Sequence, residues 1–230
     1  MIFKKEDYGI INFGDSMIFY GKIALFDFDG TLVDSMPVWG EKMFRLLRMQ
    51  GITPPEGLLR TITPLGDAGT LNYYQNNFAL TMTKEEMIQE MDNYALPKYA
   101  NEIPLKENVL NYLQALKENG VKLYILTASP HKAFEPCLQR LGILDMFEKC
   151  WCCDDFNMVK SDVNIYLEVA KTIGVNPEDI TFFDDNKVAI ETANKAGLHT
   201  IAVYDDSSSN DKEDMKKVAD YYSNEYADLI

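Results

Sequence analysis

Long apolar runs are missing from this chain of 230 residues. Its longest uninterrupted apolar stretches are short segments such as residues 23–26, whereas a membrane-spanning helix needs about 18 apolar residues or more. A secretory leader is not expected either, because Lys4, Lys5, Glu6 and Asp7 interrupt the first apolar residues. These absences predict a cytoplasmic protein without a membrane partner.

Positive charge is also scarce. The chain has 22 lysines and arginines against 36 aspartates and glutamates, which gives a net charge of −14. Such a chain repels the phosphates of nucleic acids unless a local basic patch overrides the field, and no run of basic residues could do so. We therefore expect no nucleic-acid partner. A site for an anionic metabolite would have to carry its own local positive charge.

Cysteine and histidine are too few and too scattered to indicate a zinc site. A zinc site built on the cysteines at residues 150–153 would need a second pair of ligands. The chain contains only two histidines, His131 and His199. We therefore interpret the four cysteines as free thiols, mostly in a buried strand: Cys137, Cys150, Cys152 and Cys153.

Short apolar runs alternate with helical patterns along much of the chain. Each apolar run predicts a strand that is buried on both faces, as in a parallel sheet covered by helices. These runs lie at residues 23–26, 121–126, 147–153, 180–183 and 200–204. The helical patterns lie at residues 107–118, 132–141, 163–173 and 188–196, each followed closely by glycine. The order predicts an α/β fold, a doubly wound, Rossmann-like parallel sheet.

One segment interrupts this alternation. Residues 36–107 have only helical patterns, and Thr83-Lys84-Glu85-Glu86 has the spacing of a capping box that would start one helix. We predict an inserted helical cap at residues 36–107. The α/β core would then comprise residues 22–35 and 108–230. Residues 1–21 would form an N-terminal extension, packed as a hairpin or an edge strand.

Acidic residues follow two of the predicted strands. Asp27 and Asp29 follow the first, and Asp184 and Asp185 follow the fourth. The carboxyl ends of strands are where open α/β sheets bind ligands. Four carboxylates at one edge would repel one another without a cation, and ligands that are all oxygen favour Mg²⁺, with Mn²⁺ and Ca²⁺ as competitors. The pattern predicts a Mg²⁺ site.

Groups suited to an anion occur near the same edge. Thr127 and Ser129 follow the second predicted strand shortly before a helix, where hydroxyls and free backbone amides can hold an anion. Lys160 precedes another helix and could supply a fixed positive charge. Carboxylates, a hydroxyl, a lysine and a divalent metal together are the groups needed for phosphoryl transfer.

These motifs carry a resemblance. Asp27-Phe28-Asp29-Gly30-Thr31, Thr127, Lys160 within Lys160-Ser161-Asp162, and Asp184-Asp185-Asn186 occur in this order. Over about residues 22–204 the chain resembles the haloacid dehalogenase superfamily, in the phosphatase and β-phosphoglucomutase-like branch with a helical cap. The cap of this family is inserted after the first motif, which corresponds here to residues 36–107, and it would close over the site and choose the substrate.

The resemblance implies roles for individual residues. Asp27 would be the nucleophile that forms an aspartyl-phosphate. Asp29 would be the general acid toward the leaving alcohol and then the base for the hydrolytic water. Thr127 and Lys160 would hold the transferring phosphoryl group. Apart from the resemblance, the position of Ser129 just after the second predicted strand would allow its hydroxyl to contact the substrate.

The resemblance also implies a ligand set for Mg²⁺. Asp27, the backbone carbonyl of Asp29, and Asp185 would ligate the ion, with Asp184 helping directly or through water. Many relatives have Gly-Asp where this chain has Asp184-Asp185, and an acid four residues later where it has Ala189. The double-acid variant is familiar in this branch, so the metal site is still expected.

Three other residues have less specific signals. Arg60, in the predicted cap, could meet a substrate carboxylate or a second phosphate, or form a plain surface salt bridge. His131 could touch substrate or lie on the surface. Asp34 is expected to cap the first cap helix or to orient the hinge.

The function predicted from these features is a Mg²⁺-dependent phosphatase, a monomer or weak dimer that hydrolyses a small phosphorylated metabolite. A β-phosphoglucomutase-like mutase is an alternative, although such relatives use a cap histidine and residues 36–107 contain none. A haloacid dehalogenase is less favoured because Asp29 is present. A receiver domain would have neither the inserted cap nor this order of acids. A non-catalytic phosphate-binding relative is disfavoured by the intact set of motifs.

Overall fold

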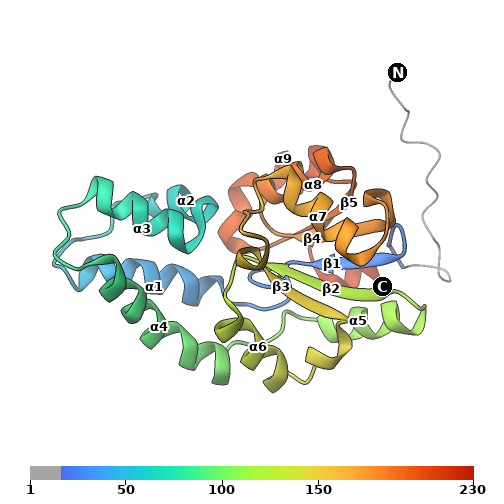
Figure 1. Ribbon diagram of the computed structural model, residues 1–230, viewed down its shortest axis with the longest axis horizontal. Helices are drawn as coiled ribbons and strands as arrows, with labels where there is room; N and C mark the ends of the chain where they lie inside the picture. Colours follow the sequence, from blue (N-terminus) through green and yellow to red (C-terminus); the bar gives the residue numbers. More distant parts are fainter. Residues whose placement is uncertain (1–16) are drawn as a thin grey trace.

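The computed structural model describes residues 17–230, except the side chains of Arg60 and Pro64. Its centre is a parallel sheet with the strand order β3-β2-β1-β4-β5-β6 (Figure 1). The strands are β1 (Ile23–Phe26), β2 (Lys122–Thr127), β3 (Lys149–Cys152), β4 (Ile180–Asp184), β5 (His199–Val203) and β6 (Tyr221–Ser223). The predicted doubly wound α/β fold is therefore confirmed. Most of the predicted N-terminal extension, residues 1–16, lies outside the described residues.

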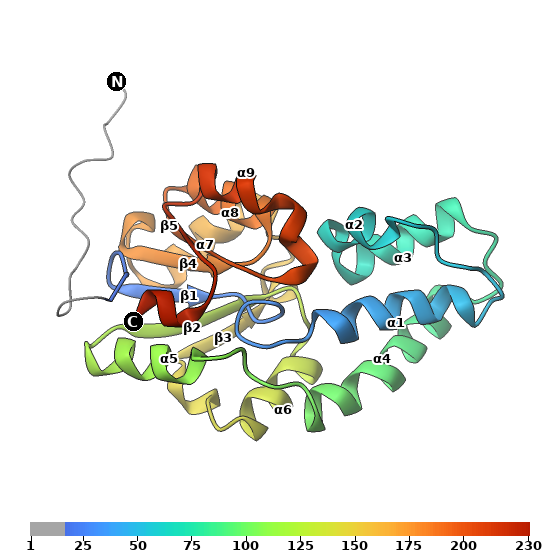
Figure 2. The ribbon, with the colours of Figure 1, turned by 180° about the vertical axis from the view of Figure 1, so that it is seen from behind.

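Helices cover both faces of the sheet (Figures 1 and 2). One face packs against α5 (Val109–Glu118) and α6 (His131–Arg140), and the other against α7 (Val163–Ile173), α8 (Lys187–Ala196) and α9 (Lys212–Val218). Neighbouring residues of one strand enter opposite cores, since strand side chains alternate between the two faces. The central strands are consequently apolar throughout, as expected for a sheet that is covered on both sides.

The last strand and last helix of the sheet domain have no counterpart among the predicted elements. Strand β6 has three residues and α9 has seven. Segments this short give too few repeats for a period of 2.0 or 3.6 residues to stand out from the surrounding sequence. Their pairing with β5 and α8 therefore depends on tertiary contacts rather than on a local signal.

A group of helices lies beyond the sheet, beside the carboxyl ends of its strands (Figure 1). It consists of α1 (Met36–Arg48), α2 (Leu58–Ile62), the 3₁₀ turn η1 (Thr63–Leu65), α3 (Gly66–Asn77) and the first part of α4 (Lys84–Asn101). These helices share an apolar cluster that is separate from the two cores of the sheet. The capping box expected at the start of α4 is present: the Glu86 amide donates to Thr83 Oγ1, and the Thr83 amide donates to Glu86 Oε2.

Helix α4 connects this group to the sheet. Residues of its first half pack in the apolar cluster with α1 and α3, whereas Ala95 and Tyr99 belong to the core between the sheet and helices α5 and α6. Asp92 of α4 forms an ion pair with Lys132 of α6, and Arg140 donates a hydrogen bond to the Tyr99 carbonyl. Through α4, the helical segment places side chains directly at the edge of the sheet.

None of the described helices has the length and apolar character needed to cross a membrane.

The start of α1 differs from the prediction. The residue that caps the helix is Ser35, while the Asp34 side chain is exposed to solvent. Neither side chain makes a capping hydrogen bond, because the Ser35 hydroxyl instead donates to Asp29 at 2.6 Å. The expected capping role of Asp34 was thus wrong, since the tight turn after β1 directs the neighbouring serine inward.

Candidate active site

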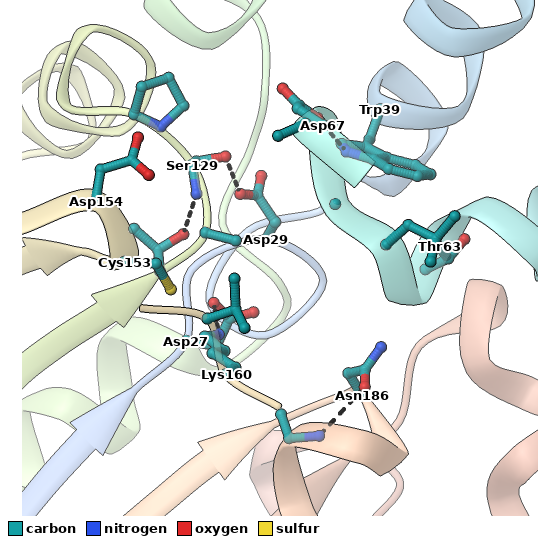
Figure 3. A pocket seen from close by; sticks show the side chains of 18 of the residues that line it. Asp27, Asp29, Trp39, Thr63, Asp67, Ser129, Cys153, Asp154, Lys160 and Asn186 are labelled. Atoms are coloured by element: carbon teal, nitrogen blue, oxygen red, sulfur yellow. Dashed lines mark hydrogen bonds and ion pairs between the residues drawn. The ribbon is translucent and has the colours of Figure 1, made fainter. Parts of the chain in front are cut away.

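A cavity of about 410 Å³ lies between the carboxyl ends of the strands and the helical group α1, α3 and α4. Figure 3 shows part of its lining, with residues of the sheet edge facing Trp39, Thr63 and Asp67 of the helical group. The structure brings seven of the predicted site residues to this cavity: Asp27, Asp29, Thr127, Ser129, Lys160, Asp184 and Asp185. The eighth, Arg60, belongs to α2, and its side chain lies outside the described part of the structure.

Lys160 joins two of the predicted carboxylates. The Asp27 amide donates to the Phe183 carbonyl at 2.8 Å, which continues the pairing of β1 with β4 one residue past the strand. Its carboxylate forms an ion pair with the Lys160 ammonium, which also lies 2.8 Å from Asp184 Oδ2. All three side chains are shielded from solvent. Two parallel strands and the loop before α7 therefore place one cation between two buried acids.

Three carboxylates at this edge form a compact group. Asp27, Asp184 and Asp185 each offer an oxygen, and these oxygens lie within 4.8 Å of one another. Burial raises the pKa of Asp27 to about 8, because it outweighs the lowering effect of the Lys160 ammonium, and the smaller contributions of Asp184 and Asp29 add to the rise. Burial, followed by the charges of Asp184, Asp27 and Asp205, raises the pKa of Asp185 well above its usual range. Ionisation of all three acids would place more negative charge here than Lys160 can balance, and all the donors are hard oxygens, so the group fits a divalent cation such as Mg²⁺.

Gly30 makes the close approach of two loops possible. Its φ of +73° lies in the left-handed region, where side chains with a Cβ are strained. A Cβ built on this residue would lie 2.6 Å from Asp185 Oδ2, which is well inside van der Waals contact. The Thr31 hydroxyl then donates to Asp185 Oδ1 at 3.2 Å. The turn after β1 therefore packs its backbone directly against a carboxylate that follows β4.

Replacing Gly30 with alanine is expected to destabilise the chain more than the same change at a glycine with open space around it. Gly142 is a matched control, because its φ is +71° and a Cβ there would meet no other atom within 4 Å. The backbone strain alone should cost about 1–2 kcal/mol in both variants, and the overlap with Asp185 should add to this at Gly30. Urea unfolding of both variants measures the difference. Equal losses would show that the loop can move away from Asp185.

Asp29 is surrounded by hydroxyl groups. Ser35 and Tyr99 donate to Asp29 Oδ1 at 2.6 and 2.5 Å, and Ser129 donates to Asp29 Oδ2 at 2.5 Å. Tyr99 is fully buried, and burial and the nearby Asp29 raise its pKa well above the usual range, so it remains a donor. Hydrogen bonds to a charged group are stronger than those between neutral groups. These hydroxyls hold the Asp29 carboxylate in one orientation, above Asp27 in Figure 3.

The loop after β2 arranges the predicted anion-binding groups. The Ser129 amide donates to Thr127 Oγ1 at 3.0 Å, and α6 begins two residues later without a side-chain cap on its first amides. Thr127 is fully buried at the end of β2. Unpaired amides at a helix start are favourable for an anion. This end of the cavity therefore combines the Lys160 ammonium with backbone donors.

Several residues of the site were not found from the sequence. Ser35 and Tyr99 belong to α1's start and to α4, and no local pattern distinguishes them from other serines and tyrosines. Lys106 is a third case: its ammonium donates to the Gly30 carbonyl at 2.7 Å and lies 3.1 Å from Asp205 Oδ2. It ties the turn after β1 to the loop after β5. The contacts of Tyr99 and Lys106 join segments far apart in the sequence, and the Ser35 contact depends on the tight turn after β1, so only the folded chain reveals them.

The opposite wall of the cavity has an acidic side chain of its own. Trp39 Nε1 donates to Asp67 Oδ1 at 2.9 Å, and the buried Lys42 ammonium lies 2.7 Å from Asp67 Oδ2. The two contacts come from α1 and fix the carboxylate at the start of α3. Figure 3 places Asp67 and Trp39 across the cavity from Asp27 and Lys160. The helical group therefore places the fixed Asp67 carboxylate on the cavity wall, where it would face a bound ligand.

Comparison with known proteins places this geometry in a family. A family model described as haloacid dehalogenase-like hydrolase matches residues 24–203. The validoxylamine A 7'-phosphate phosphatase of Streptomyces hygroscopicus is 27% identical, with 79% of this chain and 85% of that protein covered. Phosphoglycolate phosphatase 1 of Pseudomonas aeruginosa is 28% identical, with 79% of this chain and 69% of that protein covered.

A solved structure confirms the arrangement of the fold. CbbY from Rhodobacter sphaeroides, in complex with phosphate, superposes with a TM-score of 0.79 at 17% sequence identity. The match covers 90% of this chain and 96% of CbbY. At this identity the likeness concerns the fold, including the helices beside the strand ends.

Proposed function

The chain belongs to the haloacid dehalogenase-like hydrolase family, and on that basis we propose that it is a phosphatase for small phosphorylated metabolites. The observation that carries the proposal is the Asp27 carboxylate at the end of β1, paired with Lys160 and grouped with Asp184 and Asp185 at the cavity. The two relatives that match over 79% of this chain are named phosphatases, which supports hydrolysis of a phosphoric monoester. The cavity volume of about 410 Å³ suits a metabolite-sized ligand.

The first step in this proposal is attack by Asp27. One carboxylate oxygen of Asp27 forms a bond to phosphorus while the bond from phosphorus to the ester oxygen breaks, leaving an aspartyl-phosphate and an alkoxide. Asp29 donates a proton to the departing oxygen, which leaves as the alcohol. Lys160 balances the charge on the phosphoryl oxygens, and the donors around Thr127 orient them.

The second step regenerates the carboxylate. A water molecule attacks phosphorus while Asp29, now ionised, accepts one of its protons. The bond between phosphorus and the Asp27 oxygen breaks, and inorganic phosphate is released. Ser35, Tyr99 and Ser129 orient Asp29 for both transfers through their hydrogen bonds. Asp29 Oδ1 accepts two of these hydrogen bonds, but Oδ2 accepts only the one from Ser129, so Oδ2 keeps a lone pair with which it can exchange a proton with the substrate.

Mg²⁺ is the proposed cofactor. Asp27, Asp184 and Asp185 would hold it, because their oxygens converge and their combined charge exceeds that of Lys160. When bound, Mg²⁺ supplies positive charge that offsets these carboxylates and the phosphate oxygens. The roles proposed here for Asp27, Asp29, Thr127 and Lys160 are those implied by the family resemblance, which also gives the backbone carbonyl of Asp29 as a ligand of the ion.

Removing divalent metal is expected to abolish phosphate release. An excess of EDTA should lower the release of phosphate from an aryl phosphate and from a panel of sugar and polyol phosphates to the level without enzyme, and Mg²⁺ should restore it. The reason is that the buried acids repel an anionic substrate until their charge is offset. Circular dichroism with and without EDTA checks that the chain stays folded.

Three outcomes separate this function from its alternatives. Release that is unaffected by EDTA would contradict the metal-dependent proposal. Binding of phosphate without turnover of any ester in the panel would favour a non-catalytic relative. Interconversion of sugar phosphate isomers that requires a sugar bisphosphate would favour a mutase, although the helical segment α1–α4 supplies no histidine.

A further inference from the structure

His131 is held between two carboxylates beside the cavity, which its neighbours Pro130 and Lys132 line. Its Nδ1 lies 2.7 Å from Glu135 Oε1, and its Nε2 lies 2.9 Å from Asp155 Oδ2. A neutral imidazole has one N–H donor and one acceptor nitrogen, so it cannot donate to both acids. Either a second proton or a cation must therefore lie at one of the two ring nitrogens. Glu135 lies one turn further along α6, whereas Asp155 comes from the 3₁₀ turn η3 (Cys153–Phe156) after β3.

A thiol completes this group. Cys152, the last residue of β3, accepts a hydrogen bond at Sγ from the Asp155 amide, and its own amide donates to Asp155 Oδ2 at 2.9 Å. One ligand atom from each of His131, Cys152 and Asp155 lies within 4.8 Å of the other two. The sequence alone shows no second ligand pair for the cysteines, but the fold brings a histidine and a carboxylate to one of them.

We propose that His131, Cys152 and Asp155 form a second metal site, which takes a borderline transition-metal ion of the Zn²⁺ class and is distinct from the Mg²⁺ site. A nitrogen, a sulfur and an oxygen donor are the set that Zn²⁺ accepts, whereas Mg²⁺ prefers oxygen ligands alone. The acids at the floor of the cavity offer only oxygens, so the two sites differ in the ions they select.

The surroundings of the three ligands suit such an ion. Ligand atoms about 2.0–2.3 Å from a tetrahedral zinc ion lie about 3.3–3.8 Å from one another. His131 Nε2 and Asp155 Oδ2, now 2.9 Å apart, would separate slightly to admit the ion, and the Cys152 thiol lies within 4.8 Å of both. Glu135 would remain on Nδ1, which is the carboxylate contact that orients most metal-bound histidines. The Cys152 side chain is buried, while His131 and Asp155 are 39% and 36% exposed, so an ion can enter from solvent and keep water as a fourth ligand.

The location gives the site a structural consequence. His131 begins α6, two residues after Ser129, and Asp155 follows Cys153 and Asp154, which line the cavity. An ion bound here would fasten the loop after β2 to the loop after β3. It would therefore stiffen one rim of the cavity, and it would do so whether or not the chain is a phosphatase.

Cobalt absorption tests the proposal directly. We expect Co²⁺ added to the full chain in excess Mg²⁺, which fills the acid site, to give a thiolate-to-cobalt charge-transfer band that saturates at one equivalent. Zn²⁺ should compete for the same site. Cys152→Ser should remove the band, whereas Cys153→Ser, which changes the neighbouring thiol at the cavity, should keep it. Glu135→Gln should weaken Co²⁺ binding by about 10-fold or more, as for other partners of metal-bound histidines.

Stability gives a second readout. Zn²⁺ should raise the midpoint of thermal unfolding of the wild type and of Cys153→Ser, since an ion that binds only the folded state stabilises it. It should not do so for Cys152→Ser or for His131→Gln, a change at a partly exposed position that leaves the core intact. Absence of the cobalt band in the wild type, or an unchanged band in Cys152→Ser, would overturn the proposal and leave His131 as a doubly protonated ion-pair partner.

Discussion

Asp27→Asn is expected to lower phosphate release by at least about 10⁴-fold while the chain stays folded. The amide has nearly the shape of the carboxylate but is not a nucleophile toward phosphorus, and loss of a nucleophile costs rates of this order or more. Asp27 is buried, and its burial raises the pKa of the carboxyl to about 8. The carboxylate has already lost its contact with water in the folded chain, so replacing it with a neutral amide costs no further solvation energy. Phosphate release under saturating Mg²⁺, with circular dichroism of the same sample, measures both parts of the prediction.

Asp34→Asn is the matched control for this variant. It makes the same chemical change on the same loop, but the Asp34 side chain is exposed and is not among the residues that line the cavity. We expect its phosphate release to stay within about twofold of the wild type, because a change of one exposed charge has little effect on a distant carboxylate. If Asp27→Asn kept a tenth or more of the wild-type rate, another group would have to be the nucleophile.

Lys160→Met is expected to lower both activity and stability. The Lys160 ammonium contacts Asp27 and Asp184, and its side chain is only 14% exposed. Burial by itself lowers the pKa of Lys160, but Asp184 and Asp27 raise it well above the usual range, so the group is charged. Removing one partner of a buried ion pair leaves an uncompensated charge, which costs about 3–5 kcal/mol in the free energy of unfolding. Urea unfolding in EDTA measures this loss.

Two further measurements identify the cause. Lys160→Met/Asp184→Asn should recover part of the lost stability, because one of the two unpaired carboxylates becomes neutral. Mg²⁺ should also recover part of it if the acids bind the ion. Lys171→Met on α7 is the control: this lysine is 75% exposed and pairs with Glu168, so we expect a change below about 1 kcal/mol. A Lys160→Met variant as stable in EDTA as the wild type would show that the acids near Lys160 are neutral.

The location of the acids at the strand ends is the part of the site that could be predicted best. Asp27 and Asp185 each follow a short apolar run, and parallel strands bring such positions to one edge of the sheet. Thr127 could be placed at the same edge because it also follows a predicted strand, and Lys160 because it completes the ordered set of motifs. The predicted strands at residues 23–26 and 180–183 agree with β1 and β4 to within one residue. Local patterns suffice here because burial on both faces requires an uninterrupted apolar segment.

The groups that orient these acids could not be predicted in this way. The Tyr99 hydroxyl reaches Asp29 from a helix 70 residues further along the chain, and the Ser129 hydroxyl from 100 residues further. Both contacts depend on the angle at which α4 and the loop after β2 meet the sheet. A periodic pattern says which face of a helix is buried, but it does not say which polar atom that face meets. The same holds for Lys42, which is buried because Asp67 lies beside it.

By itself the sequence determined the α/β fold, the inserted run of helices, and the acids at the strand ends, since all of these depend on spacing along the chain. Only the tertiary structure decided which side chains hold Asp29, which acid lines the far wall of the cavity, and that His131 meets Cys152 and Asp155. The physical reason is that apolar periodicity acts over a few residues, whereas hydrogen bonds and metal ligation require atoms to lie within a few ångströms. Residues far apart in the chain reach such distances only after the layers have packed.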